Sequence, residues 1–265
     1  MQAQLDGGRL SWSEAGGQSE NVLLLVHGFP FNSAMWAPQL EDPPPRWRVI
    51  APDLRGFGAS EPSSDPQTMD GYAEDLATLL KHLRVREAVL CGLSMGGYVI
   101  FAFLRRYLRM ARGLVLCDTR AEADTPEARA GRKQMALSAR QQGTFAVVEI
   151  MLPRLLAQRS MRTPVETRLR QIMEASPPES VVSALRAMAT RPDSTPLLRH
   201  LGVLPTQIIV GADDALTPPG EARLLARAIP GSFLEVIPDA GHVPNLEQPR
   251  AFNTVLHRFL DGMLV

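Results

Sequence analysis

Short apolar runs that alternate with helical patterns constrain the fold of this 265-residue chain more than any other feature. The runs do not alternate apolar with polar residues, which is typical of strands buried on both faces of a mainly parallel sheet. Between them, apolar residues recur at helical spacing, as at Leu76, Leu79, Leu80 and Leu83. This predicts an α/β fold with helices on both faces of the sheet and an active site outside the carboxyl ends of its strands. The expected strands cover residues 22–26, 49–51, 88–91, 114–117, 208–210 and 233–237, and further helical patterns cover residues 98–108, 222–229 and 252–259.

Two segments depart from this alternation. Asp6, Gly7 and Gly8 are a turn signal ahead of residues 10–14 and predict an opening hairpin. Between residues 119 and 201 the pattern is helical only, so we expect an α/β core of residues 1–118 and 202–265 with an all-helical cap of residues 119–201 inserted into it. The position of this cap in the chain predicts that it covers the carboxyl edge of the sheet as a lid. Its helices are expected near residues 126–142, 144–152, 164–175 and 178–190.

The most informative motif is Gly92-Leu93-Ser94-Met95-Gly96-Gly97, which lies between a strand-like run and a helical pattern. Strand, tight turn with a central serine, then helix is the context in which G-x-S-x-G presents a nucleophile. The glycines at 92 and 96 leave room for a sharp turn that holds Ser94 in a strained backbone conformation. The turn places the hydroxyl above the amino end of a helix, where developing negative charge is favoured.

A serine hydroxyl is a weak nucleophile at neutral pH and needs a base, which in turn needs an orienting acid. Of the five histidines, His242 is the expected base, because it lies in a glycine-bracketed loop just after the last strand run. His82 and His257 fall in amphipathic helical patterns, where surface or packing roles are expected. His200 has no motif around it.

Four aspartates follow strand-like runs and are candidates for the acid: Asp53, Asp118, Asp213 and Asp214. The order Ser, Asp, His along the chain excludes Asp53, because the acid must lie between the nucleophile and the base. Position along the chain does not decide which of Asp118, Asp213 and Asp214 is the acid.

Stabilising an oxyanion requires two backbone N–H donors. Met95, directly after the serine, is expected to supply one. The loop after residues 22–26 is expected to supply the other from Phe29, because Pro30 has no N–H. His27 is expected to brace this loop through hydrogen bonds.

Several motifs together resemble the α/β-hydrolase family. They are the His-Gly-Phe-Pro turn, the Asp-Leu-Arg-Gly-Phe-Gly-x-Ser segment, the Gly-Leu-Ser-Met-Gly-Gly elbow, the Gly-x-x-Asp-x-x-x-Pro acid loop and the Gly-His-x-Pro-x-x-Glu-x-Pro ending, and they spread from residue 27 to residue 249. The acid-loop register of that family implies Asp214, with Asp213 as the nearest competitor. Residues 116–120 and 191–195 resemble the bacterial carboxylesterases of the family, and the 3-oxoadipate enol-lactonases share the pattern.

The resemblance implies a serine hydrolase with a triad of Ser94, Asp214 and His242 and no cofactor. The serine disfavours the haloalkane dehalogenases and epoxide hydrolases, which carry Asp at that position. Ester hydrolysis, lactone opening, perhydrolysis and hydrolytic C–C cleavage all use such a triad. A ligand sensor on the same fold is the alternative outside enzymes, and turnover distinguishes it from an enzyme.

The expected substrate pocket is apolar and favours a carboxylesterase for short-chain acyl esters, a small-molecule substrate. An acidic lactone requires a fixed cation, which the arginines of the cap can supply, so an enol-lactonase remains the main alternative. The residues expected to line the pocket are Phe31, Trp36, Met151 and Leu152.

Composition excludes other classes. The formal net charge is zero, which gives no electrostatic footprint for nucleic acid or an anionic membrane. The apolar runs are too short to span a bilayer, and the N-terminus lacks the basic and apolar regions of a signal peptide, so a cytoplasmic protein is expected. Cys91 and Cys117 are expected to be buried free thiols. No metal-ligand spacing or G-x-G-x-x-G motif is present, and these features do not specify an oligomeric state.

Overall fold

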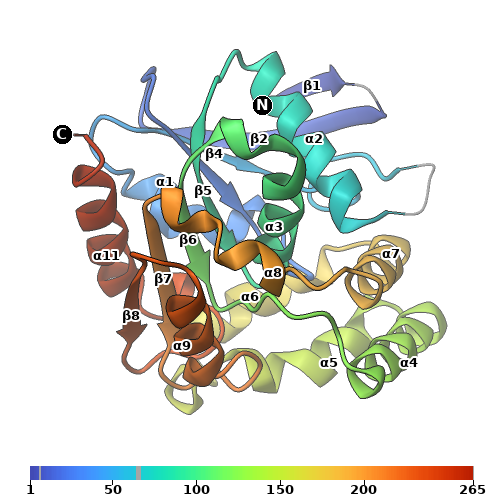
Figure 1. Cartoon of the computed structure of the whole chain (residues 1–265). Helices are drawn as coiled ribbons and strands as arrows, with labels where there is room; N and C mark the ends of the chain where they lie inside the picture. Colours follow the sequence, from blue (N-terminus) through green and yellow to red (C-terminus); the bar gives the residue numbers. More distant parts are fainter. Residues whose placement is uncertain (6, 64–66, 265) are drawn as a thin grey trace.

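The computed structural model describes residues 1–5, 7–63 and 67–264, and it contains one eight-stranded sheet in the order β1-β2-β4-β3-β5-β6-β7-β8 (Figure 1). The first two strands are antiparallel to their neighbours, whereas the strands from β3 to β8 are all parallel. This confirms the predicted mostly parallel sheet. The strands are β1 (Gln2–Leu5), β2 (Gly8–Ala15), β3 (Val22–Val26), β4 (Arg48–Pro52), β5 (Ala88–Leu93), β6 (Ala111–Cys117), β7 (Thr206–Gly211) and β8 (Phe233–Ile237).

The opening hairpin is confirmed, since β1 pairs with β2 and Leu5 faces Gly8. Asp6, part of the predicted turn signal, lies outside the described residues. The strand predicted at residues 233–237 forms, but its predicted burial is wrong. β8 is not buried on both faces, and Phe233 exposes 68% of its surface, because β8 is the last strand of the sheet and pairs only with β7.

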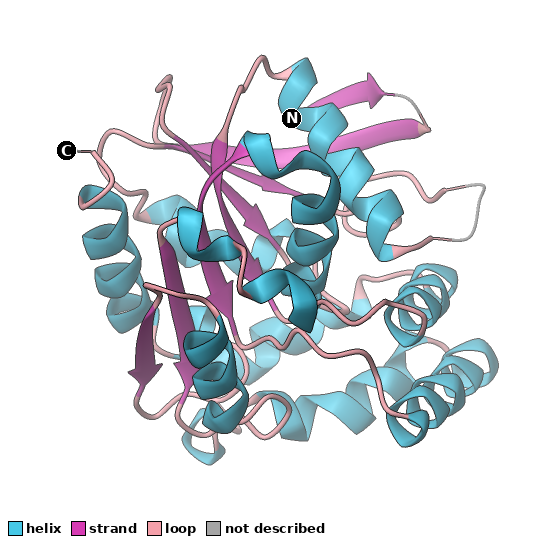
Figure 2. Cartoon of the chain, viewed as in Figure 1, coloured by secondary structure: helices cyan, strands magenta, loops and turns pink. Residues whose placement is uncertain are grey.

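Helices cover both faces of the sheet, as predicted (Figure 2). One face packs against α2 (Met69–His82), α3 (Met95–Tyr107) and α9 (Pro219–Ala228), which contribute to one large apolar cluster. The other face packs against α1 (Ala37–Glu41) and α11 (Pro249–Asp261) in a second cluster, with α10 (Pro244–Glu247) leading into α11. No described helix has both the length and the apolar character needed to cross a membrane.

All four helices expected between residues 119 and 201 form, and a short one, α8 (Thr195–Leu198), follows them. Proline at the first position begins three of the four, and Thr125 caps the first by accepting a hydrogen bond from the Ala128 N–H at 3.2 Å. In Figure 1 these helices lie beyond the arrowheads of the parallel strands. They are α4 (Pro126–Gln142), α5 (Thr144–Leu155), α6 (Pro164–Glu174) and α7 (Pro178–Ala189), called the inserted helices below.

The apolar faces of the inserted helices join both clusters of the core. Val181 and Leu185 of α7 belong to the cluster that contains α2 and α3, whereas Leu152 and Leu169 belong to the cluster that contains α11. Burial on both sides therefore fixes them over the sheet. The division into a core and a separate cap domain stays a prediction.

Candidate active site

Ser94 lies in the turn between β5 and α3, with a backbone φ of 55° and ψ of −113°. A non-glycine residue at this φ is strained, and such strain persists only where the surroundings hold it. Close backbone contacts do so here. A Cβ on Gly96 would lie 2.2 Å from the Val26 carbonyl oxygen, and Thr119 Oγ1 donates to the Ser94 carbonyl at 2.8 Å. The structure therefore places Ser94, as predicted, at the amino end of α3.

His242 and Asp214 come from the loops after β8 and β7 and form a buried pair. His242 Nδ1 lies 2.8 Å from Asp214 Oδ2, and the two residues expose 2% and 3% of their surface. Asp213 is exposed. Its backbone N–H donates to the Ala240 carbonyl at 2.8 Å, in the loop that carries His242. The structure thus brings Asp214 to His242, and it does not bring Asp213 there.

Four donors hold the Asp214 carboxylate. Its Oδ1 accepts from the N–H groups of Leu216 and Thr217 at 2.8 and 3.0 Å, and its Oδ2 accepts from Thr217 Oγ1 at 2.6 Å as well as from His242. Burial raises the pKa of Asp214, but the His242 charge and these hydrogen bonds outweigh it, so the pKa lies below its ordinary value. Asp214 is therefore an anion that can fix the imidazole tautomer with the proton on Nδ1.

The loop that carries His242 is fastened to the end of α5. The His242 N–H donates to the Leu155 carbonyl at 2.8 Å. Glu247, from α10, accepts the N–H groups of Gly241 and Ala157 at 2.7 and 2.8 Å. Burial is the largest influence on Glu247 and raises its pKa. This role of Glu247 was not predicted from the sequence, where its spacing after Gly241-His242 was the available signal.

His27 braces the loop after β3, as predicted. Its Nε2 accepts the Leu54 N–H at 2.9 Å, and its Nδ1 therefore carries a proton that it donates to the Gly28 carbonyl at 2.8 Å. Complete burial lowers the pKa of His27, which favours this neutral form. Phe29 of this loop and Ser94 line the same cavity. Within the described residues, the N–H groups of Phe29 and Met95 donate to no protein acceptor.

A cavity of about 580 Å³ contains both Ser94 and His242. It lies between the carboxyl edge of the sheet and the inserted helices, of which α4, α5 and α7 contribute to the wall. Met135, Ile150, Met151 and Met188 give that side an apolar surface. The lining from outside the insertion consists of Phe29, Ser94, Tyr98, Leu216, Thr217 and His242.

Of the four residues expected to line the pocket, only Met151 does so. Phe31, Trp36 and Leu152 are instead packing residues, each exposed by 1% or less in the cluster around α11. The expectation failed because a large apolar side chain near a loop or on a helix has the same sequence pattern in a core as in a pocket.

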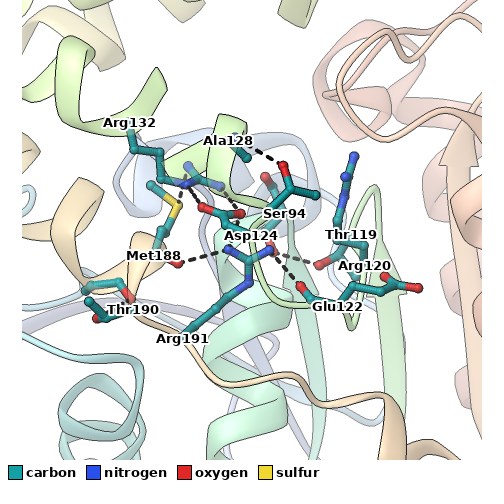
Figure 3. Close-up of polar contacts among 12 residues, drawn as sticks. Ser94, Thr119, Arg120, Glu122, Asp124, Ala128, Arg132, Met188, Thr190 and Arg191 are labelled. Carbon is teal, nitrogen blue, oxygen red and sulfur yellow. Dashed lines mark hydrogen bonds and ion pairs between the residues drawn. The ribbon is translucent and has the colours of Figure 1, made fainter. Parts of the chain in front are cut away.

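Asp124 connects the start of the insertion to its end (Figure 3). It accepts hydrogen bonds from Arg132 on α4 and from Arg191 after α7, the latter at 2.5 Å. The Arg191 guanidinium also stacks 4.0 Å from the Tyr98 ring of α3. Burial raises the pKa of Asp124, but the two arginines outweigh it and hold the pKa below its ordinary value. This ion-pair cluster fastens α4 and the end of α7 to the core, and it was not predicted from the sequence.

Two further arginines of the cavity wall lack a carboxylate partner within the described part of the chain. Arg120, just after β6, donates to the Leu216 carbonyl at 2.6 Å, and Arg154, on α5, is exposed. Since Asp124 offsets Arg132, the wall keeps a net positive charge. A positive wall raises the local concentration of anions.

Asp118, Asp214 and His242 are the one group among the described residues whose donor atoms all lie within 4.8 Å, close enough to hold a metal ion. His242 Nδ1 donates a hydrogen bond to Asp214 and therefore has no lone pair to offer an ion. The chemistry of this group fits a proton network.

Cys91 and Cys117 are buried free thiols, as predicted, and their sulfurs lie 4.0 Å apart.

Comparisons with known proteins agree with this geometry. A profile of the alpha/beta hydrolase fold matches residues 21–249, which is most of the chain. The chain belongs to the α/β-hydrolase family.

Esterases and enol-lactonases are among its relatives. A thermophilic esterase from Thermogutta terrifontis, solved with malate bound, shares 42% identity and a TM-score of 0.93, with 99% of both chains covered. The enol-lactonase from Burkholderia xenovorans LB400 shares 30% identity and a TM-score of 0.90, covering 98% of this chain and 100% of that one. The 3-oxoadipate enol-lactonase 2 of Acinetobacter baylyi is 28% identical over 256 residues, or 94% of each chain. These similarities confirm the predicted family and its branch, and they support a hydrolase.

Proposed function

We propose that this α/β-hydrolase is a serine carboxylesterase that cleaves short-chain acyl esters through an acyl-enzyme intermediate. One observation carries the proposal. Ser94, in a strained turn, lines the same cavity as His242, and His242 is held at 2.8 Å by a buried aspartate with a lowered pKa. This arrangement supports the roles of nucleophile, base and orienting acid for Ser94, His242 and Asp214.

The proposed reaction has two acyl-transfer steps. Ser94 Oγ attacks the ester carbonyl while His242 Nε2 takes its proton, and Asp214 stabilises the imidazolium through Nδ1–H. The proton then passes to the departing alcohol oxygen, leaving an acyl-Ser94 ester. Water, deprotonated by the same nitrogen, releases the acid and restores the serine.

The oxyanion of each tetrahedral intermediate is proposed to lie against the backbone N–H groups of Phe29 and Met95. Two observations support this assignment. Neither N–H has a protein acceptor among the described residues, and Met95 is the first residue of α3, where the helix dipole favours negative charge.

The inserted helices are proposed to act as the cap that selects the acyl chain. Their contribution to the cavity is largely thioether and aliphatic, which suits a small apolar group. A chain-length series of 4-nitrophenyl esters tests the proposal. We expect turnover that is highest for short acyl chains and reduced on the order of 10⁶-fold in Ser94→Ala. Sustained turnover by a folded Ser94→Ala variant would refute the assignment, and a single burst without turnover would favour the ligand-sensor alternative.

A second candidate, lactone hydrolysis of the enol-lactonase kind, is favoured by the positive wall formed by Arg120 and Arg154. Two relatives are named enol-lactonases, and the esterase relative was solved with malate, a dicarboxylate. The matched pair of 4-nitrophenyl butyrate and mono-4-nitrophenyl succinate distinguishes a neutral from an anionic acyl group of similar length. A higher kcat/KM for the succinate, together with turnover of 3-oxoadipate enol-lactone, would favour this candidate. A peroxide assay on the same variants tests the perhydrolase alternative.

A further inference from the structure

Asp118 is a second buried carboxyl beside Asp214 and His242, and the proposed reaction makes no use of it. It follows β6 directly, exposes 1% of its surface, and has a backbone φ of 46°. Its N–H donates to the Ile209 carbonyl at 3.0 Å, so the neighbouring strand β7 helps to hold this strained position. A carboxyl oxygen of Asp118 lies within 4.8 Å of both the Asp214 carboxylate and the His242 ring.

The two carboxyls are supplied very unequally with hydrogen-bond donors. Asp214 accepts four hydrogen bonds, whereas Asp118 accepts one, from the Gly211 N–H to its Oδ1 at 2.9 Å. Its Oδ2 is buried and has no donor among the described residues. As a carboxylate, Asp118 would therefore keep one oxygen without a hydrogen bond, and a buried unpaired charge is strongly unfavourable.

Two carboxyls at this separation cannot both be ionised without strong repulsion, so such pairs share one proton. We propose that this proton resides on Asp118, which acts as a neutral carboxylic acid whose O–H donates to the Asp214 carboxylate and steadies it against His242. Asp118 is then a positioning residue, and the inference about catalysis rests on the proposed function. The site keeps a single negative charge opposite the imidazolium.

The remaining charged groups around Asp118 favour the same state. Burial is the largest influence on the pKa of Asp118 and raises it well above its ordinary value, and the Asp214 charge and a side-chain hydrogen bond with Asp214 add to the rise. Among the described residues, the titratable groups that face Asp118 are Asp214 in the β7–α9 loop, His242 after β8, Glu247 of α10 and Cys117 of β6. Of these, only His242 can become a cation.

Infrared spectroscopy of the intact protein tests the protonation state without reference to activity. The difference spectrum between the wild type and Asp118→Asn at neutral pH is expected to show the carbonyl stretch of one protonated carboxyl in the wild type. That band is expected to shift in protein labelled with ¹³C-aspartate. A wild type without the band would overturn the proposal. This band is expected even if Ser94→Ala keeps full turnover. Failure of the proposed function is therefore distinguishable from failure of the proposal about Asp118.

Kinetics then test the positioning role. Asp118→Asn retains a donor toward Asp214 and an acceptor for Gly211, so its kcat at neutral pH is expected to stay within about threefold of the wild type. Its kcat is also expected to persist to higher pH, because the amide cannot ionise. Asp118→Leu is similar in size but has neither the hydrogen-bond donor toward Asp214 nor the acceptor for Gly211. Its kcat is expected to fall about tenfold with KM unchanged. A loss of about 10⁴ in Asp118→Asn would instead make Asp118 the acid of the triad and overturn the proposal. Wild-type kcat in a folded Asp118→Leu would also overturn it.

Discussion

The carboxyl edge of the sheet and the inserted helices above it differ in how completely their side chains are held. At the edge, Asp214 and His242 expose 3% and 2% of their surface, and Asp214 accepts four hydrogen bonds. On the insertion, Phe145 and Ile150 expose 59% and 45% of their surface, and Arg154 lines the cavity without a carboxylate partner among the described residues.

This difference separates two requirements of the same cavity. Groups that transfer protons must be positioned to within a fraction of an ångström, which rigid strand ends and saturated hydrogen bonds provide. Groups that admit a substrate need only shape and charge. We therefore expect changes at the edge to affect kcat strongly, and changes on the insertion to affect selectivity more weakly.

The largest effect is expected from the acid. Asp214→Asn should reduce kcat on the order of 10⁴-fold, because the amide no longer holds the His242 tautomer that accepts the serine proton. Asp213→Asn is the matched control, since its side chain is exposed and adjacent in sequence. Steady-state kinetics of both variants measure the contrast. A larger loss in Asp213→Asn would show that the bond between Asp214 and His242 is not the catalytic one.

The same glycine-to-alanine change should have opposite effects in the two regions. In Gly241→Ala, the new methyl would lie 2.6 Å from the Ala157 nitrogen, so we expect a loss of about 1–3 kcal/mol in the free energy of unfolding. Displacement of His242 should also lower kcat by up to ~10²-fold. Gly131 lies inside α4, and among the described residues no atom beyond its chain neighbours and the adjacent helix backbone lies within 4 Å of such a methyl, so Gly131→Ala should gain up to about 1 kcal/mol. Denaturant unfolding of the two variants measures this, and equal effects would contradict the difference in packing.

Asp118 and Asp124 should give the stability of the two regions opposite pH dependence. The pKa of Asp118 is raised in the folded state. Its contribution to stability is therefore present at pH values below the ordinary pKa of an aspartate, and it is lost as the pH rises through the folded-state pKa. The pKa of Asp124 is lowered in the folded state. Its contribution to stability is therefore present at pH values above the ordinary pKa of an aspartate, and it is lost as the pH falls through the folded-state pKa. Relative to the wild type, Asp118→Asn should gain in Tm and Asp124→Asn should lose, each by about 2 °C or more, between acidic and neutral pH. Thermal melts from pH 3 to 8 measure this, and parallel profiles would contradict the assigned shifts.

The smallest effect is expected from the exposed cation of the insertion. Arg154→Ala should raise KM for mono-4-nitrophenyl succinate by ~2–5-fold and leave KM for 4-nitrophenyl butyrate unchanged, as expected for a solvated charge. Added salt should reduce the difference. Arg168→Ala, an exposed arginine of α6 that does not line the cavity, is the matched control. An equal change with both esters would show that Arg154 acts on the shape of the cavity rather than through its charge.

The sequence predicted the edge of the sheet better than the insertion, for physical reasons. Sharp turns need glycine and buried parallel strands need continuous apolar runs, so Gly96 and the strands around Ser94 leave strong signals. A pocket wall leaves no such signal, because a large apolar side chain such as Trp36 satisfies a core and a cavity equally well. The roles of Glu247 and Asp118 depend on contacts between segments far apart in the chain, which spacing does not encode.

The central claim is that Ser94 carries the acyl group. Intact-protein mass spectrometry, on enzyme quenched during turnover of a slowly hydrolysed ester, tests it directly when followed by peptide mapping. We predict a mass increase of one acyl group that maps to the peptide containing Ser94 and accumulates before the steady state. Turnover with no adduct, or an adduct on another residue, would contradict the mechanism.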